Sequence, residues 1–199
     1  MNQYDFVMAG GGMAGLSLAY SLATGPFSDR SILIVDPETK GENDRTWSYW
    51  TRDQERFDPI VASTWSTLRF ASHEWTSDID LGPYRYCTIR GSDFYRRVLD
   101  ALEAHPSVEF ERGEVVEIIN ANDAAEVVTD SRRVRAGWVF DSRFDPKEYE
   151  SRRGPYHYLK QHFLGWTIES AAPVFDPHVP TLFDFRTPQH GEMRFVYVL

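Results

Sequence analysis

The sequence predicts an α/β protein in which a β-α-β unit at the N-terminus is followed by a long series of short strands. Two observations support this prediction. Residues 4–9 form a short apolar run, and the sequence GGGMAG at residues 10–15 follows it and fits the pattern G-x-G-x-x-G. A β-branched apolar run at residues 31–35 then ends at Asp36. A strand, a glycine turn, a helix, a second strand and a terminal acid in this order are typical of a Rossmann-like dinucleotide-binding domain.

The three motif glycines have distinct expected roles. Gly10 permits a sharp turn out of the first strand, Gly12 allows the backbone to approach a pyrophosphate, and Gly15 lets the helix pack closely against the sheet. The helix should run over residues 13–24, where apolar residues recur with a helical period, and it should end at the Gly-Pro pair that follows. Its N-terminus would then face the phosphates.

Asp36 is the expected partner of a ribose. Its carboxylate can accept hydrogen bonds from a ribose 2′-hydroxyl and would repel a 2′-phosphate. We therefore expect the dinucleotide to be FAD or NAD rather than NADP, and the motif alone does not distinguish the first two.

The composition is that of a folded, acidic protein. The 199 residues are 42% hydrophobic and 15% aromatic, with a formal net charge of −9 and a pI near 5.1. A nucleic acid partner is not expected because phosphate binding needs a basic surface, and an anionic membrane is disfavoured by the same charge. The single cysteine, Cys87, excludes an internal disulfide and is typical of a reducing compartment. The apolar run before Gly10 is too short for a signal peptide or a membrane span, so we expect a cytoplasmic location.

Two arginines further along the chain are candidate cofactor ligands. Arg45 opens the sequence RTWSYW, and it could bind the dinucleotide phosphates while the aromatic residues line a flavin or an apolar substrate. A surface loop followed by buried aromatic residues is an equal alternative. Arg90 lies at an expected strand-to-helix junction, where a solvated charge is more common than a ligand.

The rest of the chain is expected to form short strands around one further helix. Residues 60–66 fit either a helix or an extended segment. A helix capped by Ser92 should follow Arg90, because apolar residues recur there with a period of about 3.6 residues. Strands are expected within residues 68–81 and at 84–89, 108–111, 115–119, 126–129, 133–140, 158–169, 181–186 and 193–199.

Several other chemistries lack sequence support. The six histidines show no metal-ligand spacing and accompany no C-x-x-C, so no metal is expected. The chain has neither a G-x-S-x-G elbow nor a G-x-x-x-x-G-K-[ST] loop, which argues against a serine hydrolase and a P-loop NTPase. Cys87, which stands among apolar and aromatic residues, is expected to be a buried packing thiol rather than a nucleophile.

Five segments together resemble the bacterial lycopene β-cyclases. They are residues 10–36, NDRTWS at 43–48, QHFLGW at 161–166, LFDFR at 182–186 and RFVYVL at 194–199. The segments span nearly the whole chain in the order of the family, and the second and the last are far more distinctive than the glycine turn. The sequence Asp141-Ser142-Arg143 also matches an aspartate-x-arginine element of that family.

The resemblance implies a fold and a cofactor. It implies a para-hydroxybenzoate-hydroxylase-like architecture, in which residues 1–67 and 84–150 form the FAD-binding portion. Residues 68–83 and 151–199 would form part of a mixed or antiparallel β-rich portion that binds the substrate. The cofactor would be FAD in its reduced form, with NAD(P)H as the reductant. The expected cofactor-binding residues are Gly10, Gly12, Gly15, Asp36, Arg45 and Arg90.

The resemblance also implies a substrate and a reaction. The enzyme would be an isomerase of carotenoid biosynthesis that closes the ends of lycopene, a linear carotene, into β-ionone rings. Ring closure begins when a carboxylic acid protonates the terminal double bond. A neighbouring double bond then attacks the cation and a second proton is lost, so no net redox change occurs. Peripheral association with the inner face of the membrane would give access to this apolar substrate.

The catalytic acid is sought among the carboxylates of the chain. Family members continue beyond the FVY segment into a glutamate-rich motif credited with the acid and a second flavin-contacting glycine motif. Neither is present here, so we expect a truncated domain that retains little FAD and is inactive alone. Asp184 is the candidate acid, because Phe183 and Phe185 would bury it and so raise its pKa. The equal alternative is that Asp184 lies on a solvated face and pairs with Arg186.

Two other functions stay open at this point. A flavin monooxygenase of the same architecture would give an oxygenated product instead of an isomer. A non-catalytic module would bind the dinucleotide and convert no carotene.

Overall fold

The computed structural model describes residues 1–121, 123–144, 146–147, 154 and 159–199. These residues form two compact units. The first unit comprises Met1–Glu42 and Phe94–Lys160, and the second comprises Asn43–Asp93 and Gln161–Leu199.

The packing units do not coincide with the division expected from function. Residues 43–67 and 84–93, which the sequence assigns to the FAD-binding portion, pack in the second unit. The assignment of the two portions to FAD binding and to substrate binding stays a prediction.

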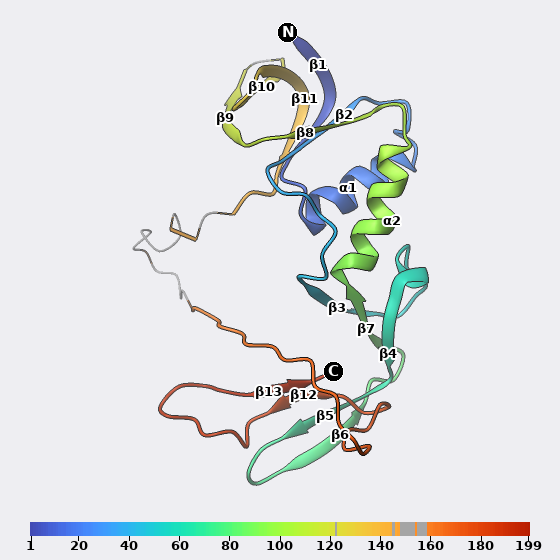
Figure 1. The fold of residues 1–199 in the computed structure, drawn as a ribbon, viewed down its shortest axis with the longest axis vertical. Helices are drawn as coiled ribbons and strands as arrows, with labels where there is room; N and C mark the ends of the chain where they lie inside the picture. The colour runs from blue at the N-terminus through green and yellow to red at the C-terminus, as the bar shows by residue number, and fades with distance from the viewer. Residues whose placement is uncertain (122, 145, 148–153, 155–158) are drawn as a thin grey trace. The chain divides into compact units, whose positions relative to one another are not determined.

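The first unit is built on one six-stranded sheet. Its strands are β1 (Asn2–Ala9), β2 (Ile32–Asp36), β8 (Val108–Arg112), β9 (Val115–Asn120), β10 (Ala125–Thr129) and β11 (Arg133–Asp141). The strand order is β8-β2-β1-β11-β10-β9 (Figure 1). The first four strands of this order are parallel, whereas β10 is antiparallel to both β11 and β9. Helix α1 (Met13–Ala23) connects β1 to β2 and contacts both, which confirms the predicted β-α-β unit.

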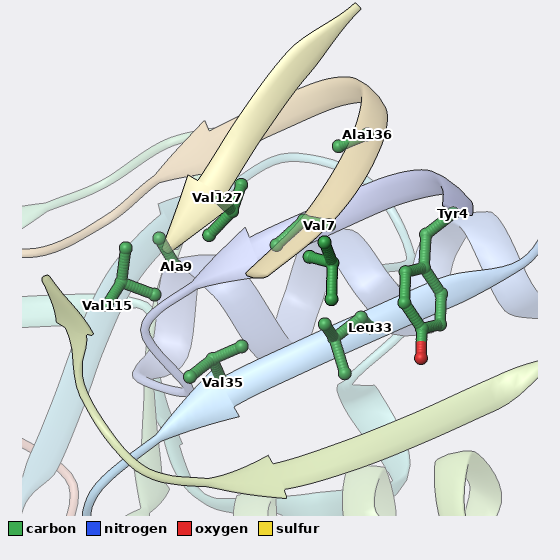
Figure 2. Close-up of a cluster of buried hydrophobic side chains, with 9 residues drawn as sticks. Tyr4, Val7, Ala9, Leu33, Val35, Val115, Val127 and Ala136 are labelled. Atoms are coloured by element: carbon green, nitrogen blue, oxygen red, sulfur yellow. The ribbon is translucent and has the colours of Figure 1, made fainter. Parts of the chain in front are cut away.

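Strand β2 is apolar from Ile32 to Val35 because side chains cover it on both faces. Residues 32–35 of β2 are each at most 1% exposed. Side chains of β1 and β2 pack against β9, β10 and β11 in one cluster (Figure 2). Burying each aliphatic side chain of this kind contributes about 1.5–3 kcal/mol. The cluster consists of Tyr4, Val7, Ala9, Leu33, Val35, Val115, Val127, Val134 and Ala136.

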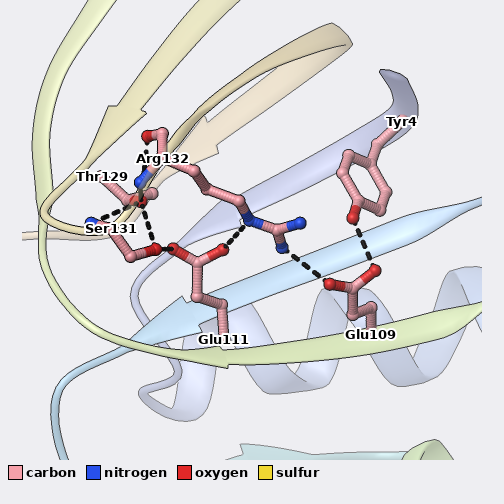
Figure 3. Close-up of polar contacts among 6 residues, drawn as sticks. All are labelled: Tyr4, Glu109, Glu111, Thr129, Ser131 and Arg132. Atoms are coloured by element: carbon pink, nitrogen blue, oxygen red, sulfur yellow. Dashed lines mark hydrogen bonds and ion pairs between the residues drawn. The ribbon is translucent and has the colours of Figure 1, made fainter. Parts of the chain in front are cut away.

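A polar network ties the edge strand β8 to the β10–β11 turn beside this cluster (Figure 3). The Arg132 guanidinium donates to Glu111 at 2.6 Å and to Glu109 at 2.7 Å. The Tyr4 hydroxyl donates to the other oxygen of Glu109 at 2.5 Å. The hydrogen bond from Tyr4 and those from Arg132 lower the pKa of Glu109. The network therefore holds the carboxylates of β8 in their charged form.

Helix α2 (Gly91–Glu103) begins earlier than expected. Strand β7 (Arg85–Arg90) ends directly before it, which confirms Arg90 at a strand-to-helix junction. Ser92 lies inside the first turn, so its prediction as N-cap is wrong. The reason is that Gly91 belongs to both elements. Its N–H donates to the Arg45 carbonyl oxygen at 2.8 Å, which continues the β3–β7 pairing, and Gly91 is also the first residue of the helix. No helix in the described part of the chain is long and apolar enough to cross a membrane.

The second unit contains a three-stranded and a four-stranded sheet. The first has the antiparallel order β3-β7-β4, and the second has the order β13-β12-β5-β6, in which only the β12–β5 pair is parallel. This confirms the predicted mixed β-rich part, and it places residues 61–65 in a strand. The elements not yet introduced are β3 (Thr46–Thr51), a 3-10 turn (Asp58–Ile60), β4 (Val61–Trp65), β5 (Thr67–Ala71), β6 (Thr76–Asp80), β12 (Thr181–Asp184) and β13 (Val196–Val198).

The strand expected at residues 158–169 is wrong over its described part. Residue 158 lies outside the described residues, and 159–169 have no regular secondary structure. Large apolar side chains there are exposed, including Leu159 at 88%, Leu164 at 82% and Trp166 at 79%. An apolar pattern alone does not make a strand, because a strand also needs a neighbour with which to exchange backbone hydrogen bonds.

Candidate dinucleotide site

The glycine motif lies at the carboxyl edge of the parallel strands in the first unit. Ala9 at the end of β1 pairs with Val35 of β2 on one side and with Asp141 of β11 on the other. The chain leaves β1 towards β2 through α1, while β11 lies on the opposite side, so this is where the strand order reverses. Open α/β sheets bind their ligands at such a point.

The backbone explains two of the three glycines. Gly10 has a φ of +109°, a backbone conformation that residues with a side chain rarely adopt. Its N–H donates to the Val35 carbonyl oxygen at 2.9 Å. A Cβ at Gly15 would collide with the carbonyl oxygen of Gly10. Gly10 thus forms the predicted sharp turn, whereas Gly15 lets the helix pack closely against this turn, and its predicted packing against the sheet stays a prediction. Their contact with a cofactor stays a prediction.

Gly12 is different, because a Cβ there would meet nothing within 4 Å. The residue is extended at the N-cap of α1, and no side chain among the described residues caps this helix end. The first N–H groups of a helix have no partner within the helix, and their partial positive charge attracts anions. An open, uncapped helix N-terminus next to a residue without a side chain fits a pyrophosphate.

Asp36 is the last residue of β2, and its carboxylate is hydrogen-bonded to the glycine loop. One of its oxygens accepts the Gly11 N–H at 2.6 Å. The other accepts the Glu38 N–H at 2.8 Å and lies 3.2 Å from the Lys40 ammonium. Burial alone would lower the pKa of Lys40, but its bonds to Glu38 and Asp36 outweigh that effect and raise it. Each carboxylate oxygen has two lone pairs, so Asp36 can still accept from a ribose hydroxyl.

Ser142 follows β11 and touches the glycine turn directly. Its N–H donates to the Ala9 carbonyl oxygen at 2.9 Å, and its Oγ lies 3.2 Å from the carbonyl oxygens of both Ala9 and Gly10. Beside it, Arg143 binds the Asp141 carboxylate through two nitrogens, each at 2.8 Å, and also donates to the Val115 carbonyl oxygen. Hydrogen bonds from Arg143 lower the pKa of Asp141. The sequence pattern singled out this tripeptide but not the part that Ser142 plays.

Arg45 and Arg90 lie in the second unit rather than in the unit of the glycine motif. Arg90 pairs with Thr46 in the β3–β7 ladder, next to Arg45. The Arg45 side chain bonds to Asp44 at 3.0 Å. The structure thus brings the two arginines to one end of the same strand pair, and their role as cofactor ligands stays a prediction.

Asp184 is not a carboxyl group with a raised pKa. Arg186 binds it through two nitrogens at 2.9 and 2.6 Å, and the Arg186 N–H donates to it at 3.0 Å. These bonds lower the pKa of Asp184 to about 2. The expectation of a raised pKa is wrong, because a bidentate cation outweighs the flanking phenylalanines. The alternative, an ion pair with Arg186, is what the structure contains.

Aromatic side chains form a continuous cluster on the second unit. The rings of Phe183 and Phe195 lie 4.9 Å apart, edge to face, and the rings of Phe195 and Tyr197 lie 5.0 Å apart. Phe163 stacks on Tyr197 at 6.0 Å and is 66% exposed. The sequence indicated aromatic strands here but not that they meet. The cluster consists of Phe70, Phe163, Phe183, Phe185, Phe195 and Tyr197.

Solved structures share the fold at low sequence identity. p-Nitrophenol 4-monooxygenase PnpA from Pseudomonas putida DLL-E4 is 20% identical with a TM-score of 0.58, over 71% of this chain and 41% of that one. The halogenase PltM is 17% identical with a TM-score of 0.54, over 75% and 36%. PqsL from Pseudomonas aeruginosa, described as a probable FAD-dependent monooxygenase, is 13% identical with a TM-score of 0.53, over 69% and 42%. The chain matches less than half the length of each.

The fold and the glycine site define the class of protein. The chain has a Rossmann-like α/β fold with a β-rich second part, and its likeness to PnpA and PqsL is one of fold. The model of the family described as lycopene cyclase protein matches residues 5–199, and the chain belongs to this family. No curated protein matches the sequence significantly.

Proposed function

We propose that the chain binds FAD at the glycine motif and belongs to a lycopene cyclase that forms β-ionone rings without net redox change. The observation that carries the proposal is the family match over residues 5–199. It coincides with a turn whose backbone fits a dinucleotide, from Gly10 to the start of α1. NAD(P)H is the proposed source of electrons for the flavin.

The residues at the carboxyl edge would hold the adenosine diphosphate half of FAD. The open backbone at Gly12 and the first N–H groups of α1 would bind the pyrophosphate. Asp36 would accept from the ribose through a lone pair that its bonds to Gly11 and Glu38 leave available. When bound, FAD in its reduced form supplies negative charge, and this charge stabilises a cation strongly where water is excluded.

The aromatic cluster supports an apolar, polyene substrate. Its rings present hydrocarbon surface, and ring faces attract a cation that develops on a neighbouring chain of double bonds. Asp184 lies between Phe183 and Phe185, and Arg186 neutralises its charge. Such a surface would favour a neutral hydrocarbon over a charged substrate. Because its pKa is low, Asp184 is a poor proton donor, and we do not propose it as the acid.

A product assay tests the proposal and separates it from monooxygenation. The complete gene product is incubated with lycopene, FAD and NAD(P)H, with and without oxygen. The carotenes are then separated, and their molecular masses are measured by mass spectrometry. A cyclase gives a product of unchanged mass under both conditions. A product heavier by one oxygen, formed only in air, would establish a monooxygenase instead. FAD binding with no carotene conversion at all would support a non-catalytic module.

A further inference from the structure

We propose that Ser142 and Asp36 form a two-sided clamp on the peptide between Gly10 and Gly11, which makes Ser142 a positioning residue for the dinucleotide. The proposal rests on dinucleotide binding at the glycine motif. It adds a residue that no sequence pattern assigns to the site, and a second task for Asp36.

The two residues hold opposite sides of one peptide group. The carbonyl oxygen of Gly10 lies 3.2 Å from the Ser142 Oγ, and the N–H of Gly11 donates to Asp36 at 2.6 Å. In a trans peptide the carbonyl and the N–H point in opposite directions. The single hydroxyl hydrogen of Ser142 is shared between the carbonyl oxygens of Gly10 and Ala9. Together with the Asp36 bond on the other side, it restrains the rotation of the peptide plane. The two clamping residues follow β11 and end β2, the strands on either side of β1.

The packing around Ser142 accounts for the glycines that face it. A Cβ at Gly10 would lie 2.6 Å from the Ser142 Oγ, and a Cβ at Gly15 would lie 3.3 Å from it. On the other side, a Cβ at Gly11 would lie 3.0 Å from the Cβ of Asp36. The clamp therefore occupies space that only glycines leave open.

The glycine-rich sequence gives a physical reason for such a clamp. Three consecutive glycines, residues 10–12, have more backbone freedom than any other tripeptide, and the space around Gly12 is open enough that a Cβ there would meet nothing within 4 Å. A pyrophosphate site needs its N–H groups in fixed directions before the ligand arrives, because ordering them on binding costs affinity. Fixing the peptide before Gly11 orients the N–H groups that follow.

The test compares Ser142→Ala with Ser131→Ala. Ser131 also donates a side-chain hydrogen bond, to Glu111 at 2.8 Å, but it lies at the β10–β11 turn, at the other end of β11. FAD affinity is measured by quenching of flavin fluorescence, and amide hydrogen exchange is measured over residues 10–14 without ligand. We expect Ser142→Ala to weaken FAD binding about tenfold, the size of one hydrogen bond. It should also speed exchange in the glycine loop, whereas Ser131→Ala should do neither.

A third variant separates positioning from stability. Ser142→Thr keeps the hydroxyl, and residue 142 is exposed, so wild-type affinity and exchange should return. Equal FAD affinity in the wild type and Ser142→Ala would overturn the clamp and leave the proposed function intact. Equal losses in Ser142→Ala and Ser131→Ala would also overturn it, because they would indicate general destabilisation. All variants are made in the complete gene product, and a wild-type product that binds no FAD would overturn the cofactor proposal and the clamp together.

Discussion

At the scale of single residues, neighbours decide what a carboxylate does. Asp36 and Asp184 both stand at the ends of apolar strands, and the sequence suggested a functional role for each. Asp36 is bonded to backbone N–H groups of the glycine loop, whereas Asp184 is bonded to an arginine two residues away. The pattern Asp-x-Arg recurs at Asp141 with the same bidentate pairing. This pattern therefore predicts a closed local ion pair better than it predicts an acid.

The Asp184 pair gives a prediction for acid pH. Its folded pKa of about 2 is below the ordinary value of 3.8, so its contribution to stability is complete above pH 3.8 and is lost as the pH falls towards 2. Because the Arg186 side chain is 52% exposed, solvent should screen the pair and keep this contribution small. Urea unfolding of wild type and Asp184→Asn at several pH values measures it. A difference in the free energy of unfolding between wild type and Asp184→Asn that grows below pH 3 would contradict this assignment.

Gly12 gives a prediction about the cofactor. Gly12→Val should fold normally, because its Cβ meets nothing within 4 Å, yet the branched side chain should block the pyrophosphate and weaken FAD binding by about a hundredfold or more. Gly41→Val is the matched control, since a Cβ at Gly41 also meets nothing within 4 Å and the residue lies in the loop after β2. Fluorescence titration measures both. Unchanged affinity in Gly12→Val would place the site elsewhere.

At the scale of elements, the sequence predicted what local pattern determines. The β1, α1 and β2 boundaries agree within two residues, because a glycine turn and an uninterrupted apolar run have few alternatives. The sequence did not predict the features that depend on contacts between residues far apart in the chain. The contact between Ser142 and Gly10 joins residues 132 positions apart, and no local signal shows that β11 becomes the neighbour of β1. The same reason explains the false strand at residues 158–169, which has the composition of a strand but no pairing partner in the described chain.

The Arg132 network gives a prediction at this scale. Arg132→Met should lower the free energy of unfolding by about 1–3 kcal/mol near pH 7, because it leaves Glu109 and Glu111 charged without their common partner. Both glutamates have pKa values lowered in the fold. The network therefore contributes above their ordinary pKa of 4.5, and the loss should shrink as the pH falls below it.

The adjacent arginine provides the control. Arg133→Met removes a single pair with Glu126 at 3.1 Å, in which the arginine is 50% exposed, and it should cost at most about 1 kcal/mol. Urea unfolding at pH 4 and pH 7 compares the two variants. Equal losses at pH 7 would mean that the network adds nothing beyond an exposed ion pair.

At the scale of the whole molecule, the chain combines an acidic composition with an apolar exposed segment. The net charge is −9, while residues 159–168 expose five large apolar side chains, those of Leu159, Phe163, Leu164, Trp166 and Ile168. A hydrocarbon substrate resides in the membrane, so the proposed cyclase must reach it there. We therefore propose that this segment mediates peripheral membrane binding, with the aromatic Trp166 at the interface between lipid and water.

The charge and the segment together predict the lipid preference. Binding through apolar side chains should be stronger on vesicles of zwitterionic lipid than on anionic lipid, because the acidic protein is repelled by the latter. Co-sedimentation with each kind of vesicle measures this, and raising the salt concentration should reduce the difference because it screens the repulsion. Trp166→Ser should release the protein from zwitterionic vesicles. Trp138→Ser, which removes a tryptophan that is 68% exposed on β11 of the first unit, should not. Stronger binding to anionic vesicles, or equal release by both variants, would rule out the segment as the membrane contact.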